Sequence, residues 1–190
     1  MWFYYFPYSG LINAVTSFIL GFFVLIKNFR LPTNRSFSYF AFSVGFWAIN
    51  YYFWFLSRQN PQALFFIRST MVGAILIPAT FTYFITCFLN QERKILNTVN
   101  FALSGVFICF AFSPAYIQKV EPRLFFPFWP VHGYLFHFIL LHFLLNVIYA
   151  HVVLWQEIKK SAGIKKIQIK YVFFGTLIGF IGGSTNYFLW

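Results

Sequence analysis

Six long apolar stretches, separated by short polar segments, set the pattern of this chain. Each has roughly the 20 mostly apolar residues that a helix needs to cross the hydrocarbon core of a bilayer. The stretches are continuously apolar, whereas the strands of a membrane barrel alternate apolar and polar residues over about ten positions. The pattern therefore predicts an all-α, polytopic transmembrane helix bundle, one domain over residues 1–190, with spans at 8–26, 37–56, 63–89, 95–112, 131–155 and 171–190.

Two further features of the pattern concern the connections. The segment from Ser113 to Pro130 is the longest connection, and its prolines and aromatic residues place it at the membrane interface. The sixth stretch runs to Trp190 without a polar flank, so we expect a seventh helix to follow, which makes these six of seven spans.

Composition supports a membrane protein and excludes most soluble classes. Apolar residues make up 60% of the chain and charged residues only 9%, whereas soluble domains are about a quarter charged. The net charge of +11 is distributed unevenly between the predicted loops. Loops 27–35, 90–94 and 156–170 hold ten of the 14 Lys and Arg residues, and the alternate loops hold three. The positive-inside rule therefore predicts an N-terminus outside the membrane.

The sequence contains few residues that could support catalysis. The three acids are Glu92, Glu121 and Glu157, all in or beside loops, and no catalytic, phosphate-binding or metal-ligand motif is present. We therefore predict no enzyme activity, no cofactor and no metal. The Lys-rich segment from Lys159 to Lys170 is beside a span, which favours contact with the lipid bilayer and its anionic headgroups and not with nucleic acid.

Polar residues inside the spans are the candidate binding site. Five helices each place one such residue at a similar depth, in the outer third of the bilayer. A charged residue within a span tends to face the bundle interior, although a long side chain near the end of a helix can also extend to the headgroups. We predict an outward-opening, ligand-binding pocket with an anion-binding guanidinium, formed by Arg68, Asn50, Asn13, His137 and Asn186.

Other positions have packing roles. Pro78 removes a backbone donor and predicts a kink in the third span, with the following threonines available to the freed carbonyl of Ala74. Gly175, Gly179 and Gly183 form a small-residue stripe for helix packing, against a seventh helix, another span or a second protomer. His142 and Asn146 share a helix face and predict an interhelical hydrogen bond.

Several segments, read in order, resemble a known family. These are NRSFSYFAFSVGFWAINYYFWFLS, ALFFIRSTMVGAILIPATFTYFITCFL with its central Pro78, WPVHGYLFHF, and IQIKYVFFGTLIGFIGGSTNYFL. Together they resemble the N-terminal seven-transmembrane sensor region of bacterial histidine kinases, truncated after the sixth helix.

The resemblance implies a function in signal transduction by a two-component system. The module would lie in the bacterial inner membrane and respond to a small or lipophilic ligand or to the state of the membrane. It would pass a helix rearrangement to a cytoplasmic output domain or a homodimer partner. A small transporter or channel component is the alternative, which would place polar groups at the midplane and usually show internal repeats.

Overall fold

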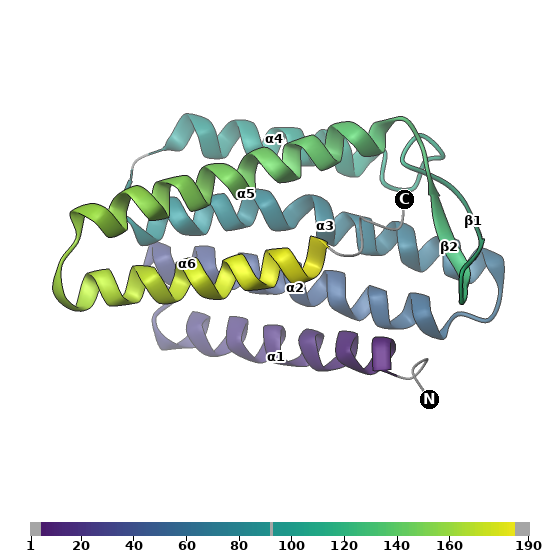
Figure 1. Ribbon diagram of the computed structural model, residues 1–190, viewed down its shortest axis with the longest axis horizontal. Coiled ribbons are helices and arrows are strands. Elements are labelled where there is room, and N and C mark those ends of the chain that lie inside the picture. Colours follow the sequence, from purple (N-terminus) through teal and green to yellow (C-terminus); the bar gives the residue numbers. More distant parts are fainter. Residues whose placement is uncertain (1–4, 92, 185–190) are drawn as a thin grey trace. The chain divides into compact units, whose positions relative to one another are not determined.

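The computed structural model describes residues 5–91 and 93–184, and its architecture is helical (Figure 1). Helices account for 79% of these residues, which confirms the predicted all-α class. The elements in chain order are α1 (Tyr5–Lys27), α2 (Pro32–Leu56), α3 (Asn60–Phe88), α4 (Lys94–Cys109), β1 (Ile117–Arg123), β2 (Phe126–His132), α5 (Leu135–Lys160) and α6 (Gly163–Ser184).

The contacts divide the chain into two compact units, Met1–Asn146 and Val147–Trp190. The first holds α1 to α4, the two strands and the first half of α5, and the second holds the rest of α5 and α6. Each unit is described by itself. The expectation of one bundle over residues 1–190 stays a prediction.

Close packing in the first unit depends on glycine. α2 packs against both α1 and α3. A Cβ at Gly73 of α3 would lie 2.7–2.8 Å from backbone and Cβ atoms of Trp47 on α2. A Cβ at Gly21 of α1 would likewise come close to the ring of Phe42. A Cβ at Gly10 would come close to the backbone of Ala48. Without side chains at these positions, the helix backbones approach closely, as is common between membrane helices.

Helix α4 carries apolar side chains outward and polar ones inward. On α4 the buried residues are Asn100 and Ser104, whereas Ile95 and Val106 are 83% and 55% exposed. Such a surface would be unfavourable in water, but in lipid tails it carries no penalty. The chain is therefore a membrane protein.

Among the helices of the described residues, three are long and apolar enough to cross a membrane, namely α1, α3 and α5. α4 is apolar but shorter, with 16 residues. α2 contains several Ser, Asn and Tyr residues and α6 begins with lysines, which lowers the mean hydropathy of each. The expectation of six spans stays a prediction beyond these three.

The connection from Ser113 to Pro130 contains structure that its sequence did not lead us to expect. β1 and β2 form an antiparallel hairpin whose register runs from the Ile117–His132 pair to the Arg123–Phe126 pair. Ile117 and Val120 on β1 and Phe126 and Trp129 on β2 are buried. β-branched and aromatic residues of this kind favour a half-buried strand. α5 then begins at Leu135, four residues later than the predicted span.

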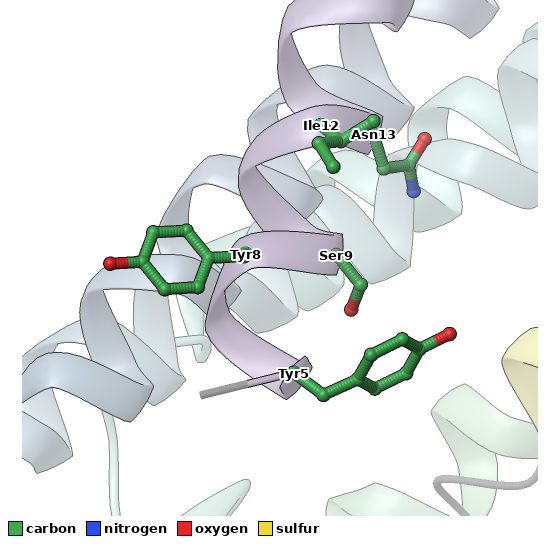
Figure 2. Close-up of a pocket in the computed structure, with 5 residues that line it drawn as sticks. All are labelled: Tyr5, Tyr8, Ser9, Ile12 and Asn13. Atoms are coloured by element: carbon green, nitrogen blue, oxygen red, sulfur yellow. The ribbon is translucent and has the colours of Figure 1, made fainter. Parts of the chain in front are cut away.

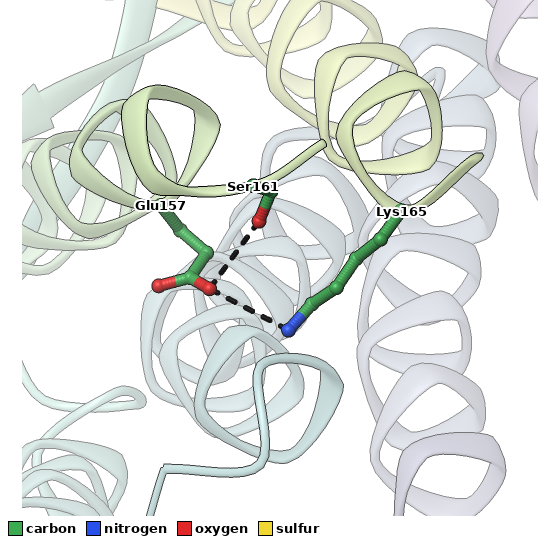
Figure 3. Close-up of polar contacts among 3 residues, drawn as sticks. All are labelled: Glu157, Ser161 and Lys165. Carbon is green, nitrogen blue, oxygen red and sulfur yellow. Dashed lines mark hydrogen bonds and ion pairs between the residues drawn. The ribbon is translucent and has the colours of Figure 1, made fainter. Parts of the chain in front are cut away.

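In the second unit the predicted Lys-rich loop is mostly helix. α5 continues to Lys160 and α6 begins at Gly163, where a φ of 58° allows the chain to turn tightly. Glu157 Oε1 accepts hydrogen bonds from Ser161 Oγ at 3.4 Å and Lys165 Nζ at 3.5 Å, which joins the two helix ends (Figure 3). The prediction of a loop over 156–170 was wrong because Lys, Ile and Gln are all compatible with helix.

Candidate functional site

The hairpin is attached to the end of α3 through Arg68. The Arg68 guanidinium donates two hydrogen bonds to the Ile117 carbonyl, from Nη2 at 2.7 Å and from Nε at 3.2 Å. Ile117 is fully buried, so water does not reach its carbonyl to take the place of this donor. Arg68 therefore positions β1, and its half-buried charge lies at the junction of helix and hairpin.

Other residues of α2 and α3 hold the same hairpin. Trp54 Nε1 donates to the Phe128 carbonyl at 2.9 Å, and Asn60 Nδ2 donates to the Val120 carbonyl at 3.4 Å. Tyr116, just before β1, is buried and its hydroxyl donates to the Met71 sulfur at 3.4 Å. Both strands thus have direct links to the helices, so movement of the hairpin is coupled to α2 and α3.

His132 ends β2 and is half-buried beside the first turn of α5. Its ring stacks on Phe136 with centroids 3.6 Å apart. Burial, together with the nearby His137 and Arg123, lowers the pKa of His132 to about 3. The ring is therefore neutral at physiological pH.

Three threonines of α3 contact three different helices. Thr80 Oγ1 donates to Ser43 Oγ on α2 at 3.4 Å, and Thr82 Oγ1 donates to Asn146 Oδ1 on α5 at 2.9 Å. Thr86 Oγ1 accepts a hydrogen bond from Asn97 Nδ2 on α4 at 3.0 Å. Within the first unit, side-chain hydrogen bonds thus join α3 to α2, α4 and α5.

The Thr82–Asn146 contact extends into a buried polar chain. Asn146 Nδ2 lies 3.3 Å from His142 Nδ1, and His142 Nε2 lies 3.5 Å from Ser104 Oγ on α4. The predicted interhelical bond of the His142–Asn146 face is confirmed. The sequence indicated the polar residues on α5, but their partners on α3 and α4 are separated from them by 38 or more residues and carried no signal of their own.

Two of the other predicted binding residues make hydrogen bonds within their own helices. Asn50 is buried and donates to the Phe46 carbonyl of its own helix at 2.8 Å. Asn13 accepts a hydrogen bond from Ser17 and lines a shallow depression on α1, where Tyr5, Ser9 and Asn13 project from one side and Tyr8 from the other (Figure 2). His137 is exposed.

Within residues 5–91 and 93–184, no hydrogen bond joins any two of Arg68, Asn50, Asn13 and His137. Asn186 lies outside the described residues. The same part of the chain contains no group of three or more side chains that could hold a metal ion. A shared ligand pocket for the five residues stays a prediction.

Pro78 lies inside α3, which continues as a helix on both sides of it. The predicted use of the threonines was wrong, because Thr80 donates to the Leu76 and Ile77 carbonyls and none of the three donates to Ala74. The kink itself stays a prediction.

On α6, a Cβ at Gly175, Gly179 or Gly183 would meet no heavy atom of the described second unit within 4 Å. The packing role of this stripe stays a prediction. The glycines that do pack closely against other helices of the first unit are Gly10, Gly21, Gly45 and Gly73.

A family model agrees with this arrangement of apolar helices. The model described as the N-terminal 7TM region of histidine kinase matches residues 10–189. The chain belongs to this family. No curated protein and no solved structure matches the chain.

Membership confirms the resemblance seen in the sequence. This histidine-kinase 7TM region is a sensor region and not a catalytic domain, and its helices are those of a membrane protein. In this chain α3 contacts the hairpin near one end, through Arg68. Further along, its three threonines contact the neighbouring helices.

Proposed function

We propose that the chain is a membrane-embedded signal-reception module. A ligand or a change of membrane state acts at the hairpin end, and the rearranged helices pass the signal to a cytoplasmic output domain, a histidine kinase or similar. The protein would lie in the bacterial inner membrane with its N-terminus and the hairpin outside, in agreement with the distribution of Lys and Arg.

One observation carries this proposal, namely that the helix α3 both holds the hairpin and contacts α2, α4 and α5. Arg68 near one end of α3 holds the Ile117 carbonyl, and the threonines further along the same helix contact α2, α4 and α5. A shift of the hairpin would therefore change the position of α3, and α3 would change the contacts of three helices.

Arg68 is also the best candidate for an anion-binding group. Two of its nitrogens bind a carbonyl, which leaves its positive charge uncompensated, since the ion pairs of the described residues are Lys119–Glu121 and Lys165–Glu157. A small or lipophilic ligand with a carboxylate or phosphate would compete for this guanidinium. Residues of neighbouring helices would then shape access of the ligand to this guanidinium, namely Asn50, Asn13, His137 and Asn186.

The test measures whether the hairpin contact sets the positions of distant helix ends. Spin labels are placed at the exposed positions Asn28 and Lys94, in a chain whose Cys87 and Cys109 are changed to Ala, and their separation is measured by double electron–electron resonance. Arg68→Gln should shift or broaden the distance distribution, because β1 loses its anchor.

Arg58→Gln is the matched control, since Arg58 is exposed and makes no side-chain hydrogen bond in the described structure. It should leave the distribution unchanged. An unchanged distribution in Arg68→Gln as well would overturn the proposed transmission.

A further inference from the structure

The turn of the hairpin has an unusual residue at its tip. Arg123 pairs with Phe126, so the two residues of the turn are Leu124 and Phe125. Leu124 has a φ of 53°, a conformation that favours Gly or Asn and is strained for a bulky side chain. Leu124 is also 75% exposed and Phe125 is 55% exposed. A strained turn that exposes most of Leu124, with Phe125 partly exposed beside it, indicates a partner outside the chain.

The depth of the tip is given by its contact with α1. The ring of Phe6 lies 6.4 Å from that of Phe125 and 5.9 Å from that of Phe126, between centroids. Phe6 is in the first turn of α1, which is one of the three helices able to cross a membrane. The tip therefore lies level with the end of a span, where the hydrocarbon core meets the headgroups.

The surroundings of the tip fit that boundary. Tyr5 and Tyr8 on the same end of α1 are 68% and 55% exposed, and tyrosine is enriched at the level of the headgroups. Lys119 is paired with Glu121 at 3.0 Å, whereas Arg123 makes no ion pair among the described residues. The Arg123 guanidinium, beside the apolar tip, is thus available for a phosphate.

We propose that the hairpin tip is a lipid-binding element, with phospholipid as its partner. Leu124 and Phe125 insert at the boundary of headgroups and acyl chains, and Arg123 binds a lipid phosphate. Lipid is favoured over a protein partner because the tip is level with the lipid-facing end of α1, where lipid is already present. This contact does not depend on the proposed signalling role.

The experiment measures the environment of the tip in the full chain, reconstituted in vesicles of phosphatidylethanolamine and phosphatidylglycerol. In the background without Cys87 and Cys109, a nitroxide is attached at Leu124→Cys, and its collision rates with oxygen and with a water-soluble nickel chelate are compared. Ile12→Cys, 65% exposed on α1, is the lipid reference, and Gln118→Cys, exposed on β1, is the water reference.

A label at 124 should collide with oxygen more often than with the chelate, as at position 12, and position 118 should show the reverse. A label at 124 that behaves like the label at 118 would overturn the proposal. Protection from both reagents, or magnetic coupling between labels on two chains, would overturn it in favour of a protein contact.

A second variant tests the phosphate contact by itself. A basic side chain near an anionic membrane surface changes partitioning by about fivefold, so Arg123→Gln should lower the ratio of inserted to non-inserted label at position 124 by about that factor in vesicles with phosphatidylglycerol. Lys119→Gln, which removes a charge already paired with Glu121, should have a smaller effect. Equal effects of the two variants would show that only overall charge matters and would remove Arg123 from the site.

Discussion

Helices α1 and α3 have nearly equal mean hydropathy, but they differ in how much of each is buried in protein. Their most apolar windows have values of 2.0 and 1.8, but 17% of the α1 window is buried in protein and 72% of the α3 window. Hydropathy therefore identifies a helix that can span the membrane without indicating whether its neighbours are lipid or other helices. Lipid tails are as apolar as a protein core, so both helices satisfy the same requirement.

Small and hydroxyl-bearing residues distinguish the two helices. α3 places Gly73 against Trp47 and three threonines against other helices. α1 has Gly10 and Gly21 on its single protein-facing side and carries Ile12 and Phe22 outward. The buried side of α3 thus combines apolar side chains with small residues that let backbones approach and hydroxyls that form hydrogen bonds.

The largest expected effect is at the closest approach of α3. Gly73→Ala places a methyl group against backbone atoms of Trp47, which cannot move without moving α2, so we expect a loss of about 3 kcal/mol in unfolding free energy. Gly105→Ala on α4 is the control, since a Cβ there would meet nothing within 4 Å in the described structure, and it should change stability by less than about 0.5 kcal/mol. Denaturation in mixed micelles measures both, and similar losses would contradict the packing described.

The same chemical change on each helix tests the comparison directly. Ile75→Ala on α3 removes a fully buried side chain and should destabilise by about 2 kcal/mol, the lower end for such cavities, because no transfer from water is involved. Ile12→Ala on α1 removes a side chain that is 65% exposed to lipid and should change stability by less than about 0.5 kcal/mol. Equal losses would mean that α1 is covered by protein in the membrane.

A pH-dependent effect is expected at the hairpin that covers the end of α3. The pKa of His132 is about 3 in the folded protein, below the ordinary value of 6.5. Between these two values the unfolded hairpin binds a proton that the folded one does not, so the hairpin loses stability as pH falls below 6.5 and keeps it above.

Hydrogen exchange of the amides of residues 117–132, corrected for the intrinsic rate, measures this loss. His132→Phe keeps the ring stacked on Phe136 and removes the titration, so its protection should not change over the same pH window. The same pH dependence in wild type and variant would assign the effect to another group.

The smallest effect concerns a single interhelical hydrogen bond. Asn146→Leu and Thr82→Val each remove one partner of the 2.9 Å bond between α5 and α3. A double-mutant cycle should give a coupling of about 0.6 kcal/mol, the average for such bonds in membranes. The pair Thr16→Val and Asn146→Leu is the control, because Thr16 bonds only to carbonyls of its own α1, and its coupling should be zero within error.

Much of the helical pattern could be predicted from the sequence, and the details that failed have a common cause. The apolar runs located all six helices to within a few residues in most cases, and the His142–Asn146 face led to a real interhelical bond. The hairpin was not expected, because its prolines and aromatic residues also fit an irregular interfacial loop. The threonines of α3 were assigned to the Ala74 carbonyl, whereas Thr80 and Thr86 bond to other carbonyls of α3 and all three threonines contact other helices.

The candidate site was predicted only in part. Depth along a helix correctly singled out Arg68 as a residue near one end of α3, but its hydrogen-bond acceptor lies 49 residues away on a strand. Asn50 and Asn13 were placed at the depth of Arg68, and the hydrogen bonds of each in the described structure are within its own helix, so their part in the site stays a prediction.

What the sequence alone determined is that this is a helical membrane protein of the histidine-kinase 7TM family, because helix hydrogen bonds are local and hydropathy sums over neighbouring residues. Only the tertiary structure decided which glycines lie between helices, which helix is surrounded by protein, and that Arg68 holds a hairpin. The reason is that these contacts join residues far apart in the chain. They depend on how each helix is rotated and paired, and in a bilayer hydrophobicity does not select among those arrangements.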